Sequence, residues 1–163
     1  FMALQTRYWG REYLMSPRYK HTQIGYLLIV LLGSALFITL YLLMVTGFNW
    51  IAIIAVLILA LCLYIFSTLT VTVTASTLDL YFTARFIHKQ FPLDAIRAVR
   101  VVKNPWYYGW GIHRVPDGWV YNVSGTQAVE LTLRNGRKER IGTDEPEQLA
   151  AAVRAATSTR QAP

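Results

Sequence analysis

The sequence predicts a membrane-anchored α+β protein, in which a transmembrane helical hairpin precedes a small β domain that is completed by one C-terminal helix. Three observations indicate this class. The 163 residues contain no Asp, Glu, Lys or Arg between His21 and Leu78. From residue 69 onward, apolar and polar residues alternate with the period of two that is typical of strands. Near the C-terminal end, apolar residues return to a helical spacing.

The composition excludes several classes of protein. Hydrophobic residues make up 54% of the chain and the mean hydropathy is +0.32, which argues against intrinsic disorder. A disulfide framework is excluded because Cys62 is the single cysteine. The charge of +7 is concentrated near the apolar stretch, so we expect no nucleic-acid partner despite the basic balance.

Two apolar runs form the predicted anchor at residues 24–69. The first covers residues 24–45, and its 22 positions would make a helix of about 33 Å, enough to cross a hydrocarbon core. It is longer than the core of a signal peptide, so we expect it to be retained. The second covers residues 50–69. Because only four residues, 46–49, separate the runs, we expect an antiparallel hairpin that crosses the bilayer twice.

The flanks of the hairpin predict its orientation. The stretch at residues 1–23 is basic and aromatic, and its charged residues are Arg7, Arg11, Glu12, Arg18 and Lys20. The short turn at 46–49 carries no charge. Because basic flanks remain in the cytoplasm, we expect both termini and the β domain to be cytoplasmic.

The predicted β domain covers residues 70–157 and leaves a tail at 158–163. Seven segments have strand character, at 69–74, 78–83, 86–91, 96–102, 119–123, 129–134 and 137–141. Asn135-Gly136 is typical of a type I′ turn between the last two. Asp144 and Pro146 then mark the start of a helix. The buried stripe of that helix is expected at Leu149, Ala152, Val153 and Ala156.

This order of elements resembles the bacterial pleckstrin-homology-like (PH-like) membrane proteins, in which a two-helix anchor precedes such a domain. The segments that carry the resemblance are LTVTVTASTLDLYF at 69–82, FPLDAIRAVRV at 91–101, GWGIHRVPDGWVYNVSG at 109–125 and VELTLRNGRKERIGTDEPEQLAAAV at 129–153. The resemblance implies a PH-like, seven-stranded, antiparallel, partly open barrel that is plugged by the C-terminal helix. It also implies the bacterial inner membrane as the location. Fold alone does not supply function.

The first candidate site is an aromatic segment at residues 104–113. It contains Trp106, Tyr107, Tyr108 and Trp110 beside two glycines. Trp and Tyr combine an apolar body with a polar tip, which suits a membrane interface or a protein contact. The alternative is that these side chains cover an open end of their own barrel.

Two further candidates are a basic hairpin and the N-terminal stretch. Arg134, Arg137, Lys138 and Arg140 surround one turn, where they would bind anionic lipid headgroups or form a solvated surface. In the N-terminal stretch, Tyr8 and Trp9 alternate with arginines, which suits a partner contact. The alternative for that stretch is a basic flank that only sets topology.

No pattern of catalytic or cofactor-binding residues is present. The three histidines lie in unrelated contexts, and no metal-binding spacing or phosphate-binding glycine loop occurs. We therefore expect no enzyme, no cofactor, no metal and no small-molecule substrate. The leading hypothesis is an accessory subunit that is anchored in the bilayer and stabilises a larger membrane complex, for example a photosynthetic or respiratory one. The alternative is a lipid-sensing module that uses the basic hairpin.

Overall fold

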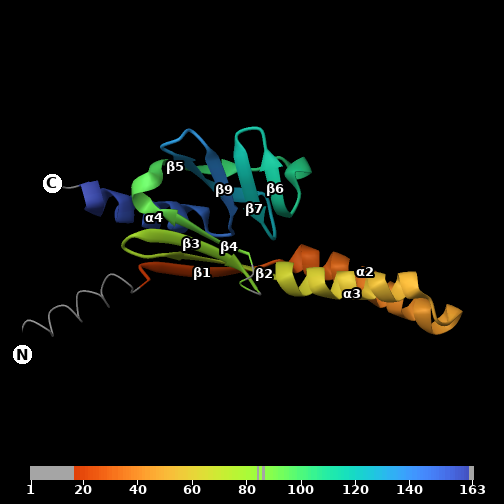
Figure 1. Ribbon diagram of the computed structural model, residues 1–163. Helices are drawn as coiled ribbons and strands as arrows, with labels where there is room; N and C mark the ends of the chain where they lie inside the picture. The colour runs from red at the N-terminus through yellow and green to blue at the C-terminus, as the bar shows by residue number, and fades with distance from the viewer. Residues whose placement is uncertain (1–16, 84, 86, 162–163) are drawn as a thin grey trace, which may run out of the picture.

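The computed structural model describes residues 17–83, 85 and 87–161, and its first element is a strand that precedes the helical hairpin. Strand β1 (Tyr19–Ile24) pairs antiparallel with β2 (Thr68–Val73), with Gln23 opposite Leu69. The two helices between them therefore form a long connection between neighbouring strands (Figure 1). The predicted N-terminal stretch at 1–23 is thus partly a strand of the β domain.

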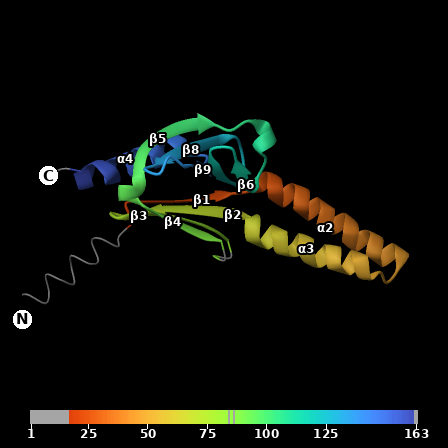
Figure 2. The same ribbon diagram turned by 45° about the horizontal axis from the view of Figure 1, so that its top comes forward.

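The hairpin consists of α2 (Tyr26–Thr46) and α3 (Trp50–Phe66), which pack side by side and project from the β domain (Figure 2). Gly47 ends α2 with a φ of +85°, which a glycine adopts readily. Asn49 begins α3, and its side-chain oxygen accepts hydrogen bonds from the backbone N–H groups of Ile51 and Ala52 at 2.9 and 3.3 Å. Neither helix contains a buried residue.

The prediction of two full-length membrane spans needs a correction. Among the described residues, one helix, Tyr26–Thr46, is long and apolar enough to cross a membrane. The second, Trp50–Phe66, is apolar but has 17 residues, and it ends before the predicted boundary at 69 because Thr68 already pairs with Ile24 in the sheet.

The β domain contains two sheets instead of the predicted seven-stranded barrel. The first has the order β1-β2-β3-β4, where β3 is Thr77–Phe82 and β4 is His88–Pro92. The second has the order β5-β8-β9-β7-β6. Its strands are β5 (Ile96–Lys103), β6 (Gly111–Val115), β7 (Gly118–Asn122), β8 (Gln127–Leu133) and β9 (Lys138–Gly142).

Two strands account for the difference in number. β1 lies before the apolar runs, in a basic stretch that was interpreted as a flank of the membrane anchor and not as a strand. β6 lies in the glycine-rich segment, where the alternation of apolar and polar residues is interrupted. The second sheet also contains one parallel pair, β7 with β9, which places Gly118 opposite Lys138. The domain is therefore α+β with a four-stranded and a five-stranded sheet.

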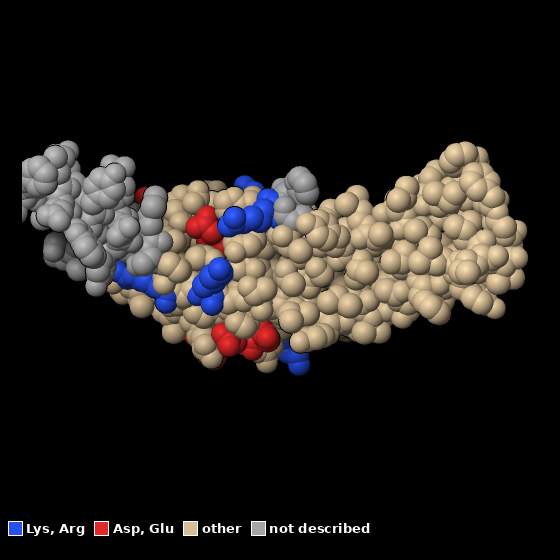
Figure 3. Space-filling model, turned by 90° about the horizontal axis from the view of Figure 1, so that it is seen from below, with Lys and Arg blue, Asp and Glu red and all other residues tan. Residues whose placement is uncertain are grey.

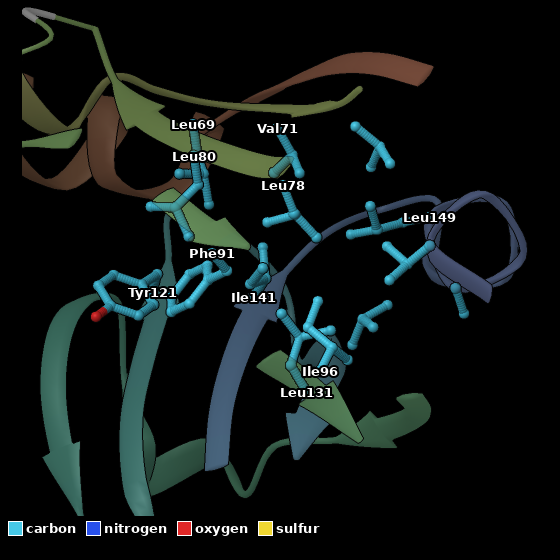
Figure 4. Close-up of a cluster of buried hydrophobic side chains, with 14 of the residues drawn as sticks. Leu69, Val71, Leu78, Leu80, Phe91, Ile96, Tyr121, Leu131, Ile141 and Leu149 are labelled. Carbon is cyan, nitrogen blue, oxygen red and sulfur yellow. The ribbon is translucent and has the colours of Figure 1, made fainter. Parts of the chain in front are cut away.

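The hydrophobic core lies between the two sheets and is closed by α4 (Pro146–Gln161), as Figure 4 shows. Sheet residues that face inward include Leu69, Leu78, Leu80, Phe91, Ile96, Tyr121, Leu131 and Ile141. Helix α4 contributes Leu149, Val153 and Ala156, all buried, while Ala152 is half-buried. The predicted stripe is confirmed, although the helix continues to residue 161. Each buried Leu or Ile stabilises the fold by about 1.5–3 kcal/mol.

Candidate functional site

The aromatic segment forms a short 3₁₀ turn, η2 (Trp106–Tyr108), between β5 and β6. Trp106 is 83% exposed and Tyr107 is 69% exposed. Tyr108 and Trp110 are half-buried, and the indole nitrogen of Trp110 is shielded from solvent. The structure therefore divides the four predicted contact residues: Trp106 and Tyr107 are presented outward, whereas Tyr108 and Trp110 lie against the domain.

Arg140 holds this turn against the second sheet. Its guanidinium group lies 5.5 Å from the centre of the Tyr108 ring, which is within the range of a cation–π interaction. Arg140 Nε donates to Glu130 Oε2 at 2.9 Å, and Arg140 Nη1 donates to Asn104 Oδ1 at 3.5 Å. Because Glu130 and Asn104 are buried, this network fixes the base of the aromatic turn.

The aromatic turn lies at the end of the domain from which the helices project. The backbone N–H of Asn104 donates to the carbonyl of Thr126. In the same β7–β8 loop, the carbonyl of Ser124 accepts a hydrogen bond from Gln23 Nε2 at 3.2 Å. Val123, which precedes Ser124 in this loop, packs closely on Gly25. A Cβ added to Gly25 would lie 3.1 Å from the Val123 carbonyl oxygen. The turn, this loop and the start of α2 are therefore neighbours (Figures 1 and 2).

The basic hairpin is largely neutralised. Arg137 pairs with Glu139 at 3.1 Å, and Lys138 pairs with Asp117 at 3.2 Å. Arg140 is committed to Glu130 and points to the outer face of the second sheet. Of the four predicted lipid-binding cations, Arg134 is exposed at the turn, where its backbone N–H donates to the carbonyl of Ala95.

The basic hairpin also lies at the end of the domain farther from the helices. β8 starts at Gln127, beside the loop that contacts Gly25, and it runs away from the helices to Leu133. These seven residues extend about 20 Å at the rise of a strand. The basic hairpin is therefore far from α2 and α3.

Tyr8 and Trp9, the second pair of predicted contact residues, lie outside the described residues. The described part of the N-terminal stretch contacts the C-terminal helix and the loop that precedes it. Arg18 Nη1 donates to Thr159 Oγ1 at 3.4 Å, and His21 Nε2 lies 2.6 Å from Asp144 Oδ1. Burial and the nearby Glu145 carboxylate raise the pKa of Tyr19 well above its ordinary value. The described end of this stretch, from residue 17 to residue 23, is therefore part of the folded domain.

A polar groove on the outer face of the first sheet was not anticipated from the sequence. It has a volume of about 560 Å³ and is lined by Pro17, Lys20, Thr72, Asp79, Tyr81, Arg85 and His88. Figure 3 looks onto the domain from below, where basic and acidic side chains are interspersed, and the projecting hairpin shows none of either. Alternation alone places Thr72, Asp79 and Tyr81 away from the core. Only the pairing of four strands brings them together with Lys20 and His88.

His88 and Asp79 are hydrogen-bonded to each other within this groove. His88 Nε2 lies 3.2 Å from Asp79 Oδ1, and the other carboxylate oxygen accepts a hydrogen bond from Thr77 Oγ1 at 2.8 Å. The guanidinium group of Arg85 lies 4.6 Å from the centre of the Tyr81 ring. Sequence patterns assigned no partner to Asp79 or His88, because the two residues are nine positions apart and lie on different strands.

A second, smaller cleft of about 340 Å³ opens between the two sheets, and it is lined by Ile87, His88, Lys89, Ile112, Trp119 and Tyr121. Glu139 lies nearby on the inner face of β9, beside Tyr121. Among the residues that the structure describes, no group of three His, Cys, Asp or Glu side chains is arranged to hold a metal ion.

No protein-family model, curated protein or solved structure matches this chain. The resemblance to the bacterial PH-like membrane proteins therefore stays a prediction.

Proposed function

We propose that the protein is a non-catalytic accessory subunit of a larger membrane complex, held in the bacterial inner membrane by the α2–α3 hairpin. The helices have no buried residue, and no charged residue occurs from 21 to 78. In water they would expose a continuous apolar surface far larger than soluble proteins tolerate. A bilayer removes that cost.

Both helices can be accommodated in a membrane. The 21 residues of α2 are long enough to cross it. The 17 residues of α3 extend about 25 Å, at the short end of the range for a span. Because β1 and β2 are neighbours in one sheet, the hairpin leaves and rejoins the domain at the same place. This arrangement supports a two-pass topology with both termini and the β domain in the cytoplasm, where Arg18, Lys20 and Arg85 flank the bilayer.

The observation that carries the proposal is the position of Trp106 and Tyr107. Both are exposed, both are fixed through Tyr108 and Arg140, and both lie at the end of the domain next to the start of α2. A partner in the same membrane would meet the hairpin and this aromatic turn together. Trp and Tyr are among the residues that contribute most to protein interfaces. Photosynthetic and respiratory assemblies are complexes of this kind.

Co-purification from native membranes tests the proposal. We expect Trp106→Ala/Tyr107→Ala to lose the partner subunits while the β domain keeps its thermal stability, because exposed side chains contribute little to folding. The matched control is Phe48→Ala/Trp50→Ala, which removes two similarly exposed aromatic side chains at the opposite end of the hairpin. Retention of every partner by the Trp106/Tyr107 variant, or migration of the wild-type chain as a lone monomer, would contradict the proposal.

The alternative, a lipid-sensing module that uses Arg134, Arg137, Lys138 and Arg140, is not favoured by these observations. Three of the four cations are paired with carboxylates, and the hairpin lies at the end of the domain far from the helices.

A further inference from the structure

We propose that the polar groove on the outer face of the first sheet binds an anionic phosphate group, and that a lipid headgroup in the adjoining bilayer supplies it. The groove is lined by Pro17, Lys20, Thr72, Asp79, Tyr81, Arg85 and His88. This proposal rests on the membrane location proposed above, and it concerns a different surface from the aromatic turn and from the basic hairpin.

The groove combines donors that suit a phosphate. Lys20 and Arg85 are both exposed, so their charges are available to a ligand. Arg85 also stacks on Tyr81, which leaves the edge of its planar guanidinium group free to donate hydrogen bonds. Thr72 adds a hydroxyl group between Lys20 and Asp79, because these three residues are opposite one another in the register.

Asp79 is the one acid among the described residues that line the groove, and both of its carboxylate oxygens already have hydrogen-bond partners. Thr77 donates to one of its carboxylate oxygens, and His88 contacts the other. The side chain of Asp79 is only 18% exposed, whereas that of His88 is 50% exposed. The groove therefore presents positive charge to a ligand, unlike the basic hairpin, whose cations are neutralised.

One end of the groove lies at the level where the chain enters the bilayer. Thr83, at the end of β3, contacts the residues that follow α3: its hydroxyl lies 2.8 Å from Ser67 Oγ and accepts from the backbone N–H of Thr68 at 3.0 Å. Arg85 follows two residues later, and its own N–H donates to the carbonyl of Phe82 at 2.8 Å. A headgroup that stands upright beside α3 would meet Arg85 first and then Lys20.

Native mass spectrometry of the full chain tests this. The protein is released from bilayers that contain equal amounts of phosphatidylglycerol, which is anionic, and phosphatidylcholine, which is zwitterionic. We expect wild type to retain the anionic lipid selectively. Lys20→Gln/Arg85→Gln should lower that selectivity about tenfold, because each cation near an anionic headgroup contributes measurably to binding.

Two further variants separate the groove from general charge and from misfolding. Arg97→Gln/Arg134→Gln removes two exposed cations at the far end of the domain and should leave the selectivity unchanged. Asp79→Asn removes the acid of the groove, keeps an oxygen that can accept from Thr77, and should increase retention. A damaged fold cannot produce such an increase.

The outcomes distinguish the source of the phosphate and the proposal on which it rests. Displacement of the lipid by inorganic phosphate from wild type, at concentrations that leave the Lys20/Arg85 variant unaffected, would assign the groove to a free anion. Equal lipid retention by wild type and that variant, or an equal loss in the Arg97/Arg134 control, would contradict the proposal that the groove binds the headgroup. Extraction of the wild-type chain by alkaline carbonate would instead overturn the membrane location itself.

Discussion

Two glutamates on neighbouring strands are buried on opposite faces of the second sheet. Glu130 points outward and is paired with Arg140, in the network that fixes the aromatic turn. Glu139 points inward beside Tyr121, and Arg137 contacts one of its oxygens at 3.1 Å. The second oxygen, Oε2, is shielded from solvent and has no hydrogen-bond partner. A buried carboxylate with an unpaired oxygen favours its protonated form.

This environment makes folding stability depend on pH. Burial raises the pKa of Glu139 above its ordinary value of 4.5, and the neighbouring Arg137 offsets only part of that. The unfolded chain therefore releases this proton at a lower pH than the folded chain does. The protonated Glu139 carboxyl group makes its full contribution to the free energy of unfolding below pH 4.5. That contribution is lost as the pH rises through the pKa of Glu139 in the folded chain.

We therefore expect Glu139→Gln to flatten this dependence and to raise the melting temperature at neutral pH, since the amide carries no charge to desolvate. Thermal unfolding of the full chain in detergent, on either side of pH 4.5, measures the effect. The control is Glu147→Gln, an exposed acid in the first turn of α4, which should leave the profile unchanged. An unchanged pH profile in the Glu139 variant would show that folding does not shift the pKa of the Glu139 carboxyl group.

At the scale of elements, the second sheet depends on one close approach between parallel strands. Gly118 in β7 lies opposite Lys138 in β9, and a Cβ at Gly118 would lie 1.6 Å from the Lys138 carbonyl oxygen. That atom belongs to the backbone and cannot rotate away. The β6–β7 hairpin, and with it the end of the aromatic segment, depends on this glycine.

We expect Gly118→Ala to separate β7 from β9 and to destabilise the domain by more than about 3 kcal/mol, because overpacking against backbone cannot be relieved by a rotamer change. Denaturant or thermal unfolding of the full chain measures this loss. Gly33→Ala is the matched control, since a Cβ there meets no atom within 4 Å and the helix gains a better helix former. Equal stability of the two variants would show that β7 and β9 are not paired as described.

At the scale of the whole molecule, the hairpin is a connection between β1 and β2 that projects from one end of the domain (Figure 2). The same end carries the aromatic turn and the opening of the polar groove. The opposite end carries the basic hairpin. The surfaces of the domain are therefore ordered along one axis by their distance from the hairpin.

This arrangement predicts the accessibility of cysteines in intact cells. In a Cys62→Ser background, Phe48→Cys at the tip of the hairpin should react with a membrane-impermeant maleimide added outside, because the proposed topology places the tip on the far side of the membrane. Arg97→Cys, exposed on the β domain, should react only after lysis. Labelling of both positions in intact cells, or of neither, would contradict the two-pass topology.

Helices and strands with a clear local pattern could be predicted before the structure was known. The absence of charge from His21 to Leu78 predicted two apolar helices, and alternation predicted most of the strands. The stripe at Leu149, Val153 and Ala156 predicted the closing helix. The aromatic segment could also be identified as a candidate contact site, because four of its five positions from 106 to 110 are aromatic. Each of these signals depends on neighbours in the chain.

Contacts between residues far apart in the chain could not be predicted from these local patterns, and the folded structure establishes them. It paired β1 with β2 across the 43 residues, 25–67, that lie between them, and this pairing created the polar groove. It neutralised Arg137, Lys138 and Arg140 with acids, one of which, Asp117, lies on another hairpin. The fold also leaves the side chains of Trp106 and Tyr107 exposed, whereas those of Tyr108 and Trp110 are half-buried. Strand register and strand order decide these contacts, and neither is encoded by the period of a single segment.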